Sequence, residues 1–338
     1  QRPSSPGEGM IRFNTDSGHL EYYAQGYWAD VIVNNNELGG GTGSNTGTGT
    51  RGLIGGGSEP SVSDTINYIT ISTLGNAQDF GNLSQAREYP AAGQGSSTTR
   101  GLFAGGRTSP SNYVDTIDFV TMASTGDASD FGNLTVTRHY GGIHGDGTRT
   151  VIGGGYNPPA NTDVIDYVTV AQTGNAVDFG NLVAASSDHA AMGSKIRAIF
   201  GGNGTDDRMD YITISSTGNA QDFGNLTSSL TQTGGLSNST RGIVAGGNSP
   251  VGLVNTIQYV TIATTGNAQD FGDLTQIRRM CGSVSSPTRG VCLGGSTPSL
   301  ENTIDCFEIL STGNAIDFGD LAIDAVLLNG NSTGHGGL

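Results

Sequence analysis

One phrase that occurs six times constrains this chain more than any other feature. Asp-Phe-Gly-Asn/Asp-Leu recurs with its Phe at positions 80, 131, 179, 223, 271 and 318, at spacings of 51, 48, 44, 48 and 47 residues. Internal similarity at a fixed period of about 20 to 50 residues is typical of solenoids, propellers and repeat arrays. The chain from residue 50 onward is therefore expected to fold as six copies of one unit.

Each copy predicts four short strands. An Arg opens an apolar run that ends on two small residues, as in residues 100–106, and such pairs tolerate the positive φ at a strand end. An alternating β-branched and aromatic segment follows, as in residues 65–71. Thr-Gly-Asn-Ala then turns the chain into the Asp-Phe-Gly strand, and a fourth segment leads to the next Arg. Four strands in about 48 residues match one propeller blade.

This order of elements resembles the kelch repeat, in which a strand closing on Gly-Gly precedes strands that carry large aromatic residues. The resemblance covers residues 50 to about 331 and implies an all-β, six-bladed kelch-like propeller. The chain departs from the kelch pattern in its last strand, where Phe replaces the usual Trp. Its one Trp, Trp28, lies outside the repeats.

The two ends of the repeat region are complementary. The first copy begins at Thr50 and Arg51 on its second strand, without an innermost strand. The last copy runs past Phe318 into residues 321–330, which align with the innermost strand of the other copies. We expect this C-terminal strand to complete the first blade and to leave no free edge. The Gly-rich residues 330–338 are expected to be flexible.

Composition narrows the classes of function. Glycine makes up 56 of the 338 residues without the every-third spacing of collagen, and it disfavours helix. The formal net charge of -15 and the lack of a basic run argue against nucleic-acid binding. No stretch approaches the roughly 18 apolar residues that would suggest insertion into a membrane.

Residues 1–38 do not fit the repeat. Residues 9–23 predict a β-hairpin around Asn-Thr-Asp-Ser-Gly, and residues 27–31 predict a third short strand. Residues 39–49 are almost wholly Gly, Thr, Ser and Asn, which predicts a flexible linker to the propeller at 50–338. Because so small a sheet buries little on its own, we expect it to attach to a partner.

The N-terminal run Gly-Met-Ile-Arg-Phe-Asn-Thr-Asp-Ser-Gly, followed by Leu-Glu-Tyr-Tyr and a Trp, resembles a segment of bacteriophage tail-fibre and other virion structural proteins. The phrase Thr-Gly-Asn-Ala-x-Asp-Phe-Gly-Asn-Leu is similar to propeller-containing structural proteins of tailed phages, marine ones especially. The resemblance implies a place on the virion. Residues 1–38 would then contact other virion proteins, and a host-surface glycan or receptor would be the propeller's partner; a homo-oligomer stays open.

No catalytic constellation is evident. Of the five histidines, only His139 and His144 have a spacing that could suggest a metal pair, and a loop or surface role is the simpler interpretation. Cys281, Cys292 and Cys306 fall in the sixth copy as buried thiols, with a disulfide between the first two as the alternative. We expect a protein that is not an enzyme and needs no metal or cofactor.

Two charged positions recur in all six copies. They are Asp79, Asp130, Asp178, Asp222, Asp270 and Asp317, and Arg51, Arg100, Arg149, Arg197, Arg241 and Arg289. Each set could form an ion-binding ring, in which the carboxylates would bind cations and the guanidinium groups would bind anions. The structural alternative is that each Asp accepts N–H groups of its own turn or pairs with the Arg, and that each Arg ties strands through a carboxylate or carbonyl. Because a site usually breaks symmetry, we favour the structural interpretation.

Length varies mainly between the second and third strands, in residues 58–64, 107–115, 156–163, 204–209, 248–255 and 296–302. These connections are expected on the face opposite the repeated arginines, and variable loops on a rigid scaffold often carry recognition. The candidate contacts are Arg107, Tyr113, Tyr156, Asn157, Asp207 and Arg208, because aromatic rings and guanidinium planes stack on sugars or anchor protein contacts. Plain surface loops are the alternative.

The leading hypothesis is a non-enzymatic virion surface protein, of tail-fibre or appendage type, that displays the propeller for host-surface or glycan recognition. A structural decoration or connector of capsid or tail, with the propeller packed on other virion proteins, is the first alternative. An enzyme that acts on polysaccharide is the second.

Overall fold

The computed structural model describes residues 6–7, 9–14, 19–24, 26–30, 50–58, 61–109, 112–203, 206–326 and 329–338. These residues are all-β, with strands joined by turns and no helix among them. Within the same ranges there is accordingly no helix of a length and apolarity that would cross a membrane. The chain divides into two compact units, Gln1–Gly47 and Thr48–Leu338. The linker expected at 39–49 and the hairpin tip at 15–18 lie outside the described residues.

The N-terminal unit is a three-stranded antiparallel sheet of β1 (Ile11–Asn14), β2 (His19–Ala24) and β3 (Tyr27–Asp30), in that order. The hairpin and the third strand expected from the sequence are both present. An ion pair of 2.8 Å joins Arg12 Nε to Glu21 Oε2 across the hairpin, and the rings of Tyr23 and Trp28 lie 5.4 Å apart on β2 and β3.

The larger unit repeats a four-stranded antiparallel sheet, which the fourth copy shows in full. Its strands are β19 (Ala190–Gly193), β20 (Arg197–Gly201), β21 (Arg208–Thr213) and β22 (Gln221–Asn225), in that order. The fifth copy has β23 (Gly234–Ser237), β24 (Arg241–Ser249), β25 (Gly252–Thr261) and β26 (Gln269–Asp273). The sixth has β27 (Gly282–Ser285), β28 (Arg289–Leu293), β29 (Thr303–Glu308) and β30 (Ile316–Asp320). We call the four strands of a copy inner, second, third and outer.

The inner strands of the first three copies are hydrogen-bonded to one another. The first has β4 (Arg51–Gly55), β5 (Thr65–Thr70) and β6 (Gln78–Asn82), and the third has β13 (Gly142–Gly145), β14 (Arg149–Gly153), β17 (Val164–Thr169) and β18 (Val177–Asn181). The second has the inner strand β7 (Ala92–Gln94) and a separate sheet of β8 (Arg100–Ala104), β11 (Thr116–Thr121) and β12 (Ser129–Asn133). β7 pairs in parallel with β13 and with the C-terminal strand β31 (Asn329–Ser332), so inner strands of different copies meet.

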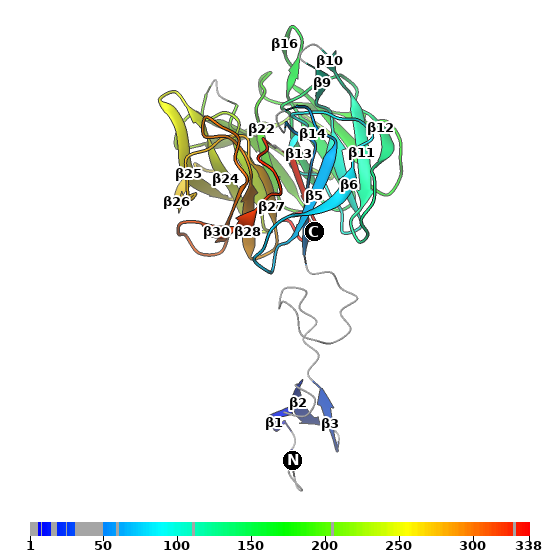
Figure 1. Cartoon of the computed structure of the whole chain (residues 1–338), viewed down its shortest axis with the longest axis vertical. Helices are drawn as coiled ribbons and strands as arrows, with labels where there is room; N and C mark the ends of the chain where they lie inside the picture. The colour runs from blue at the N-terminus through cyan, green and yellow to red at the C-terminus, as the bar shows by residue number, and fades with distance from the viewer. Residues whose placement is uncertain are drawn as a thin grey trace. The chain divides into compact units, whose positions relative to one another are not determined.

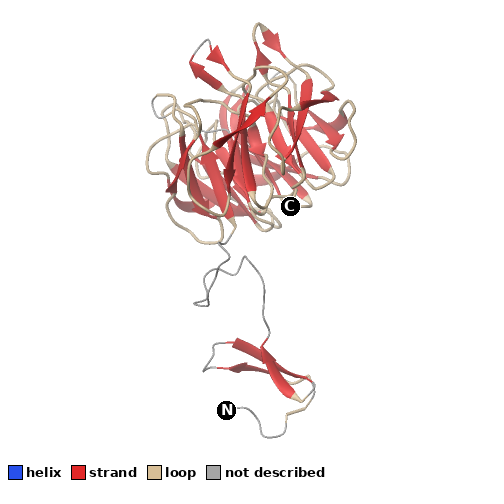
Figure 2. Ribbon diagram, turned by 90° about the vertical axis from the view of Figure 1, so that its right-hand side faces the viewer, coloured by secondary structure: helices blue, strands red, loops and turns tan. Residues whose placement is uncertain are grey.

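β31 lies at the inner edge of the first copy, but it begins at Asn329, near the end of the segment 321–330 in which the sequence predicts this strand. It pairs antiparallel with β4, with Asn331 opposite Leu53. Two small hairpins, β9 (Arg107–Ser109) with β10 (Asn112–Tyr113) and β15 (Tyr156–Asn157) with β16 (Ala160–Asn161), project from one end of this unit (Figure 1, Figure 2). The C-terminus lies at the other end (Figure 1).

A bulge explains the recurring Phe-Gly. In the third copy Ile165 lies opposite Gly180 and Asp166 opposite Asp178, so Phe179 is left without a partner across the strands. Its side chain is 2% exposed and meets the Tyr167 ring edge to face. Gly180 has φ +144°, and an added Cβ would lie 2.4 Å from the carbonyl oxygen of Gly218 in the next copy. The same register shift occurs in all six copies.

The hydrophobic core lies between successive copies. Separate clusters join the first copy to the second, the second to the third, and so on to the sixth. One further cluster joins Ile304 and Phe318 of the sixth copy to Ile54 and Ile71 of the first. Each copy therefore buries both faces of its sheet against two others.

The C-terminal residues are packed, so the expectation of a flexible segment at 330–338 is wrong. Asn331 and His335 are buried, and the Thr333 N–H donates to the Arg51 carbonyl at 3.1 Å. A Cβ on Gly337 would lie 1.8 Å from the Gly145 carbonyl oxygen. Glycine permits this close approach of two backbones. Because glycine is also typical of flexible linkers, the composition of the segment alone does not distinguish the two cases.

Candidate functional site

Each repeated Arg is the first residue of a second strand and ties its copy to the next one. Its Nη1 donates to the carbonyl that follows the third strand of the next copy. The bonds run from Arg51 to Met122 (2.9 Å), Arg100 to Val170 (2.9 Å), Arg149 to Ile214 (3.2 Å), Arg197 to Ile262 (3.1 Å), Arg241 to Ile309 (2.8 Å) and Arg289 to Ile71 (2.9 Å). The sixth Arg thus donates back to the first copy. We call this end of the unit the arginine end.

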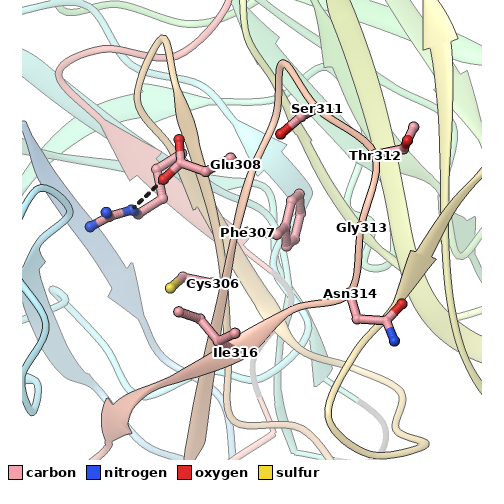
Figure 3. A pocket seen from close by; sticks show the side chains of 9 residues that line it. Cys306, Phe307, Glu308, Ser311, Thr312, Gly313, Asn314 and Ile316 are labelled. Atoms are coloured by element: carbon pink, nitrogen blue, oxygen red, sulfur yellow. Dashed lines mark hydrogen bonds and ion pairs between the residues drawn. The ribbon is translucent and has the colours of Figure 1, made fainter.

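The guanidinium groups are also stacked in five copies. They lie over an aromatic ring of the third strand, at 4.6 to 4.9 Å from Tyr68, Phe119, Tyr167, Tyr211 and Tyr259. The sixth copy differs, because Cys306 takes the aromatic position and Arg289 Nε instead bonds Glu308 at 3.4 Å, beside a cleft of about 210 Å³ (Figure 3). Carbonyl ties and ring contacts occupy these side chains, which favours the structural interpretation over an anion-binding ring.

The six repeated Asp residues are all exposed on the outer strands. Each precedes the inward-facing Phe, so its own side chain faces solvent. Asp222 and Asp317 accept the N–H two residues on, from Gly224 at 3.2 Å and Gly319 at 3.1 Å. Within the described part of the chain none of the six forms an ion pair with a repeated Arg, so that form of the structural interpretation is wrong.

A different set of Arg–Asp pairs, which the sequence reasoning missed, is fully buried. Arg87 Nη2 lies 3.0 Å from Asp118, Arg278 Nη2 lies 2.8 Å from Asp305, and Arg138 pairs with Asp166. Burial lowers the pKa of the Arg87 and Arg138 guanidinium groups, and attraction to the partner carboxylate opposes this shift. Each Arg lies seven residues after the repeated Phe.

Comparison of the copies could have revealed these pairs. In two of the three copies that lack the Arg, the partner position changes too: Leu230 accompanies Gln258 in the fifth copy, and Ala325 accompanies Asn67 in the first. The fourth copy has Ser186 instead of the Arg. There Asp210 pairs with Arg208 of its own strand at 2.9 Å.

The end opposite the arginines, here called the loop end, carries the connections between second and third strands. The segments that lead into the inner strands lie beside these connections. Bridges join Glu88 to Arg107, His139 to Tyr156, Thr231 to Asn248 and Arg279 to Ser296. Both short hairpins belong to this end. Residues 59–60, 110–111 and 204–205 of the connections lie outside the described residues.

Four of the six predicted contact residues, Arg107, Tyr113, Tyr156 and Asn157, lie together at the loop end. The Tyr113 ring lies 4.9 Å from His139 and 6.1 Å from Tyr156, in two neighbouring copies. The Arg107 guanidinium lies 4.9 Å over Tyr89. Its Nε also bonds Glu88 at 2.7 Å. Asn157 follows Tyr156 in β15 and accepts from the Thr137 hydroxyl at 3.4 Å.

Asp207 and Arg208 do not join this cluster. Arg208 pairs with Asp206 at 3.2 Å as well as with Asp210, so it replaces the buried Arg of other copies. The Asp207 carbonyl accepts the Leu226 N–H at 2.7 Å. Both residues are predicted as ligand contacts because they lie in a variable loop. Their contacts in the structure are instead within the fourth copy, and loop position alone does not indicate this.

Five non-glycine residues at the loop end have the left-handed backbone conformation. They are Tyr89, Tyr140, Asp188, Gln232 and Met280, with φ between 55° and 64°. Each lies nine residues after a repeated Phe, just before an inner strand, and we call them the axial ring. Backbone conformations of this kind cost about 1–3 kcal/mol for a non-glycine residue and cluster at functional sites. The equivalent residue of the remaining copy, 327, lies outside the described residues.

The axial ring is joined by backbone and side-chain contacts. The Asp188 N–H donates to the Tyr140 carbonyl at 2.8 Å, and the Met280 N–H to the Gln232 carbonyl at 2.8 Å. The rings of Tyr89 and Tyr140 stack at 4.6 Å. Met280 packs in one cluster with both tyrosines. Residues that precede five different inner strands thus contact one another.

A polar network runs through the ring. The Asp188 carboxylate accepts from Ser187 Oγ at 3.0 Å and from Gln232. Gln232 Oε1 accepts from Arg279 Nη1 at 3.0 Å. Burial raises the pKa of Asp188, and burial lowers the pKa of the nearby His139 to about 4, so this imidazole is neutral at pH 7.

The ring offers hydroxyl, amide and carboxylate groups for hydrogen bonding. His139 and His144 do not meet, because the His144 ring lies 5.5 Å from His335 at the other end. In the described ranges no cluster of three or more His, Cys, Asp or Glu could hold a metal ion. The three cysteines are buried free thiols, so the alternative disulfide of Cys281 and Cys292 is wrong; the two side chains interact through a thiol hydrogen bond.

No protein-family model matches the chain, and a search of curated protein sequences finds no significant match.

Proposed function

We propose that residues 50–338 form a six-bladed, kelch-like β-propeller whose first blade is completed by β31. Three independent sets of contacts support a ring. The core clusters include one between the sixth and first copies, the arginine ties return from Arg289 to Ile71, and β31 pairs with β4. The Asp320 N–H also bonds Asn76 Oδ1 at 3.0 Å, as equivalent residues do between the other copies.

We further propose that the protein is a non-enzymatic virion surface protein, of tail-fibre or appendage type, whose propeller recognises a host-surface glycan or receptor with its loop end. The observation that carries this proposal is the group of half-buried aromatic residues with Arg107 and the strained axial ring at that end. Large aromatic residues and arginines dominate the energetics of many binding surfaces. The place on the virion rests on the resemblance of the N-terminal and repeat phrases to phage structural proteins.

Binding of the full chain to bacterial envelope preparations tests the recognition function. The double variant Tyr113→Ala/Tyr156→Ala is expected to weaken binding, because it removes two rings from the loop end. Lys195→Ala, at an exposed position of the arginine end, is the matched control and should bind like the parent protein. Equal binding by the double variant and the parent would refute recognition through this surface and favour a decoration packed on virion proteins.

A further inference from the structure

We propose that the axial ring binds a neutral, hydroxyl-rich saccharide unit through Tyr89, Tyr140, Asp188 and Gln232. The inference rests on the proposed recognition function and gives it a ligand class and a location. Four features of the ring support this proposal. They are the non-glycine residues at strained backbone positions, the fixed hydrogen-bonding groups of Asp188 and Gln232, the tyrosine rings, and the balance of charge around the site.

The residue types at the five positions are the first argument. Glycine adopts positive φ without steric cost, and this chain uses it at most such positions, for example Gly105 and Gly106 at the end of β8. None of the five axial positions is Gly, although Gly makes up 56 of 338 residues. A purely structural turn would be more stable with Gly. The side chains are therefore placed here at a cost in backbone strain, as is typical of functional positions.

The hydrogen-bonding groups are the second argument. Arg279 holds the Gln232 amide oxygen at 3.0 Å, which leaves the amide nitrogen to donate toward Asp188. Ser187 Oγ fixes the carboxylate from another side. Asp188 and Gln232 are thus held in place before any ligand arrives, which reduces the ordering cost of binding. A carboxylate and an amide side by side can accept from and donate to adjacent hydroxyl groups of one sugar ring.

The tyrosines supply the apolar part. Both rings are half-buried and stack on each other at 4.6 Å, with Arg107 over Tyr89 and His139 beside Tyr140, so their exposed edges supply the apolar contact. The Asp188 N–H bonds the Tyr140 carbonyl. Small-molecule sites typically combine aromatic surface with a few fixed polar groups. A saccharide presents a matching pair of surfaces, with C–H groups on one face of the ring and hydroxyl groups at its edge.

Charge selects a neutral ligand. The Arg279 and Asp188 charges are linked through Gln232, and Arg107 is paired with Glu88 at 2.7 Å, so the site and its surroundings carry balanced charge. The chain as a whole has a formal charge of -15, which repels anions at long range. An acidic sugar would also bring its carboxylate toward Asp188. Neutral hexose or N-acetylhexosamine units satisfy the same hydrogen bonds without this repulsion.

The test is an array of neutral oligosaccharides that contain glucose, galactose, mannose or N-acetylglucosamine, printed beside sialylated and uronate-containing ones and probed with the full chain. Titration of the best neutral binder then follows by calorimetry. Asp188→Gly is the diagnostic variant, because Gly relieves the backbone strain and removes the half-buried carboxylate. We expect its melting temperature to match or exceed that of the parent, and its affinity to fall at least about tenfold. Asp222→Asn, on an exposed outer strand, is the control and should keep full affinity.

Three results would overturn the proposal. They are retention of no neutral saccharide, preferential retention of acidic saccharides, and an Asp188→Gly variant that melts earlier and binds normally, as a structural turn would. If envelope preparations still bind the parent protein when no neutral saccharide does, recognition stands and the ligand class is wrong. If the chain binds neither, the recognition function itself fails.

Discussion

The buried pair of Arg278 and Asp305 provides the sharpest test of how the copies are held together. Asp305 lies 2.8 Å from Arg278 Nη2 and also accepts the N–H and hydroxyl of Thr275, at 3.0 and 2.7 Å. Asp305→Asn leaves the guanidinium buried without a counter-charge. Removal of one partner from a buried pair costs about 3–5 kcal/mol in the free energy of unfolding, because the remaining charge cannot reach water.

The fifth copy supplies the matched control, since it has Leu230 and Gln258 at the same two positions. There the Thr227 N–H bonds Gln258 Oε1 at 2.7 Å, which replaces the bond from Thr275 to Asp305. The double variant Arg278→Leu/Asp305→Gln should therefore recover more than half of the loss. Replacement of a buried ion pair by a well-packed apolar residue is often neutral or stabilising.

Urea unfolding of the full chain at pH 7, followed by fluorescence and circular dichroism, measures both variants against the parent. The expected order of midpoints is parent, double variant, then Asp305→Asn. Two results would refute this explanation. One is a loss of less than about 1 kcal/mol in the free energy of unfolding for Asp305→Asn, and the other is a double variant as unstable as the single one, because either would mean that the unpaired buried guanidinium is not what destabilises the protein.

Three further predictions concern packing and pH. Gly180→Ala should lower the unfolding midpoint more than Gly174→Ala. Both residues have φ near +150°, but only at Gly180 would the new Cβ lie 2.4 Å from a backbone oxygen, so equal midpoints would contradict this prediction. Burial lowers the pKa of His144 and His335 to about 4 and about 3, so the folded chain binds fewer protons than the unfolded one. Stability should fall as the pH drops from about 6.5 toward these values, by about 1.4 kcal/mol per pKa unit and histidine, and a His144→Gln/His335→Gln variant should show a flatter profile from pH 7 to 4. Deletion of residues 333–338 should lower the melting temperature, and an unchanged value would show that this segment adds no stability.

The strands and their order could be predicted from the sequence because each copy repeats the same alternation and the same turn phrases. The pairing of β31 with β4 follows from the same repetition, since one copy lacks an inner strand and the chain has one left over. For Arg51 and its equivalents the sequence left two alternatives, an anion-binding ring or a hydrogen bond that joins strands. That the acceptor is a backbone carbonyl and not a carboxylate could be learned only from the three-dimensional structure.

Other features could not be predicted for physical reasons. Gly337 looks like part of a flexible end, because glycine serves both unpacked linkers and close backbone contacts. The pair of Arg138 and Asp166 escapes a search for sixfold motifs, since only half of the copies contain it. The left-handed conformation of Tyr140 contradicts its local preference, and only the surrounding strands impose it.

The central claim is that six copies close into one ring through β31 and β4. Hydrogen-exchange mass spectrometry of the full chain tests it directly, because an unpaired strand near a chain end loses its amide protons rapidly. A peptide containing residues 329–332 should be protected as strongly as one containing β23, the inner strand of the fifth copy. Rapid exchange of 329–332 while β23 stays protected would contradict it.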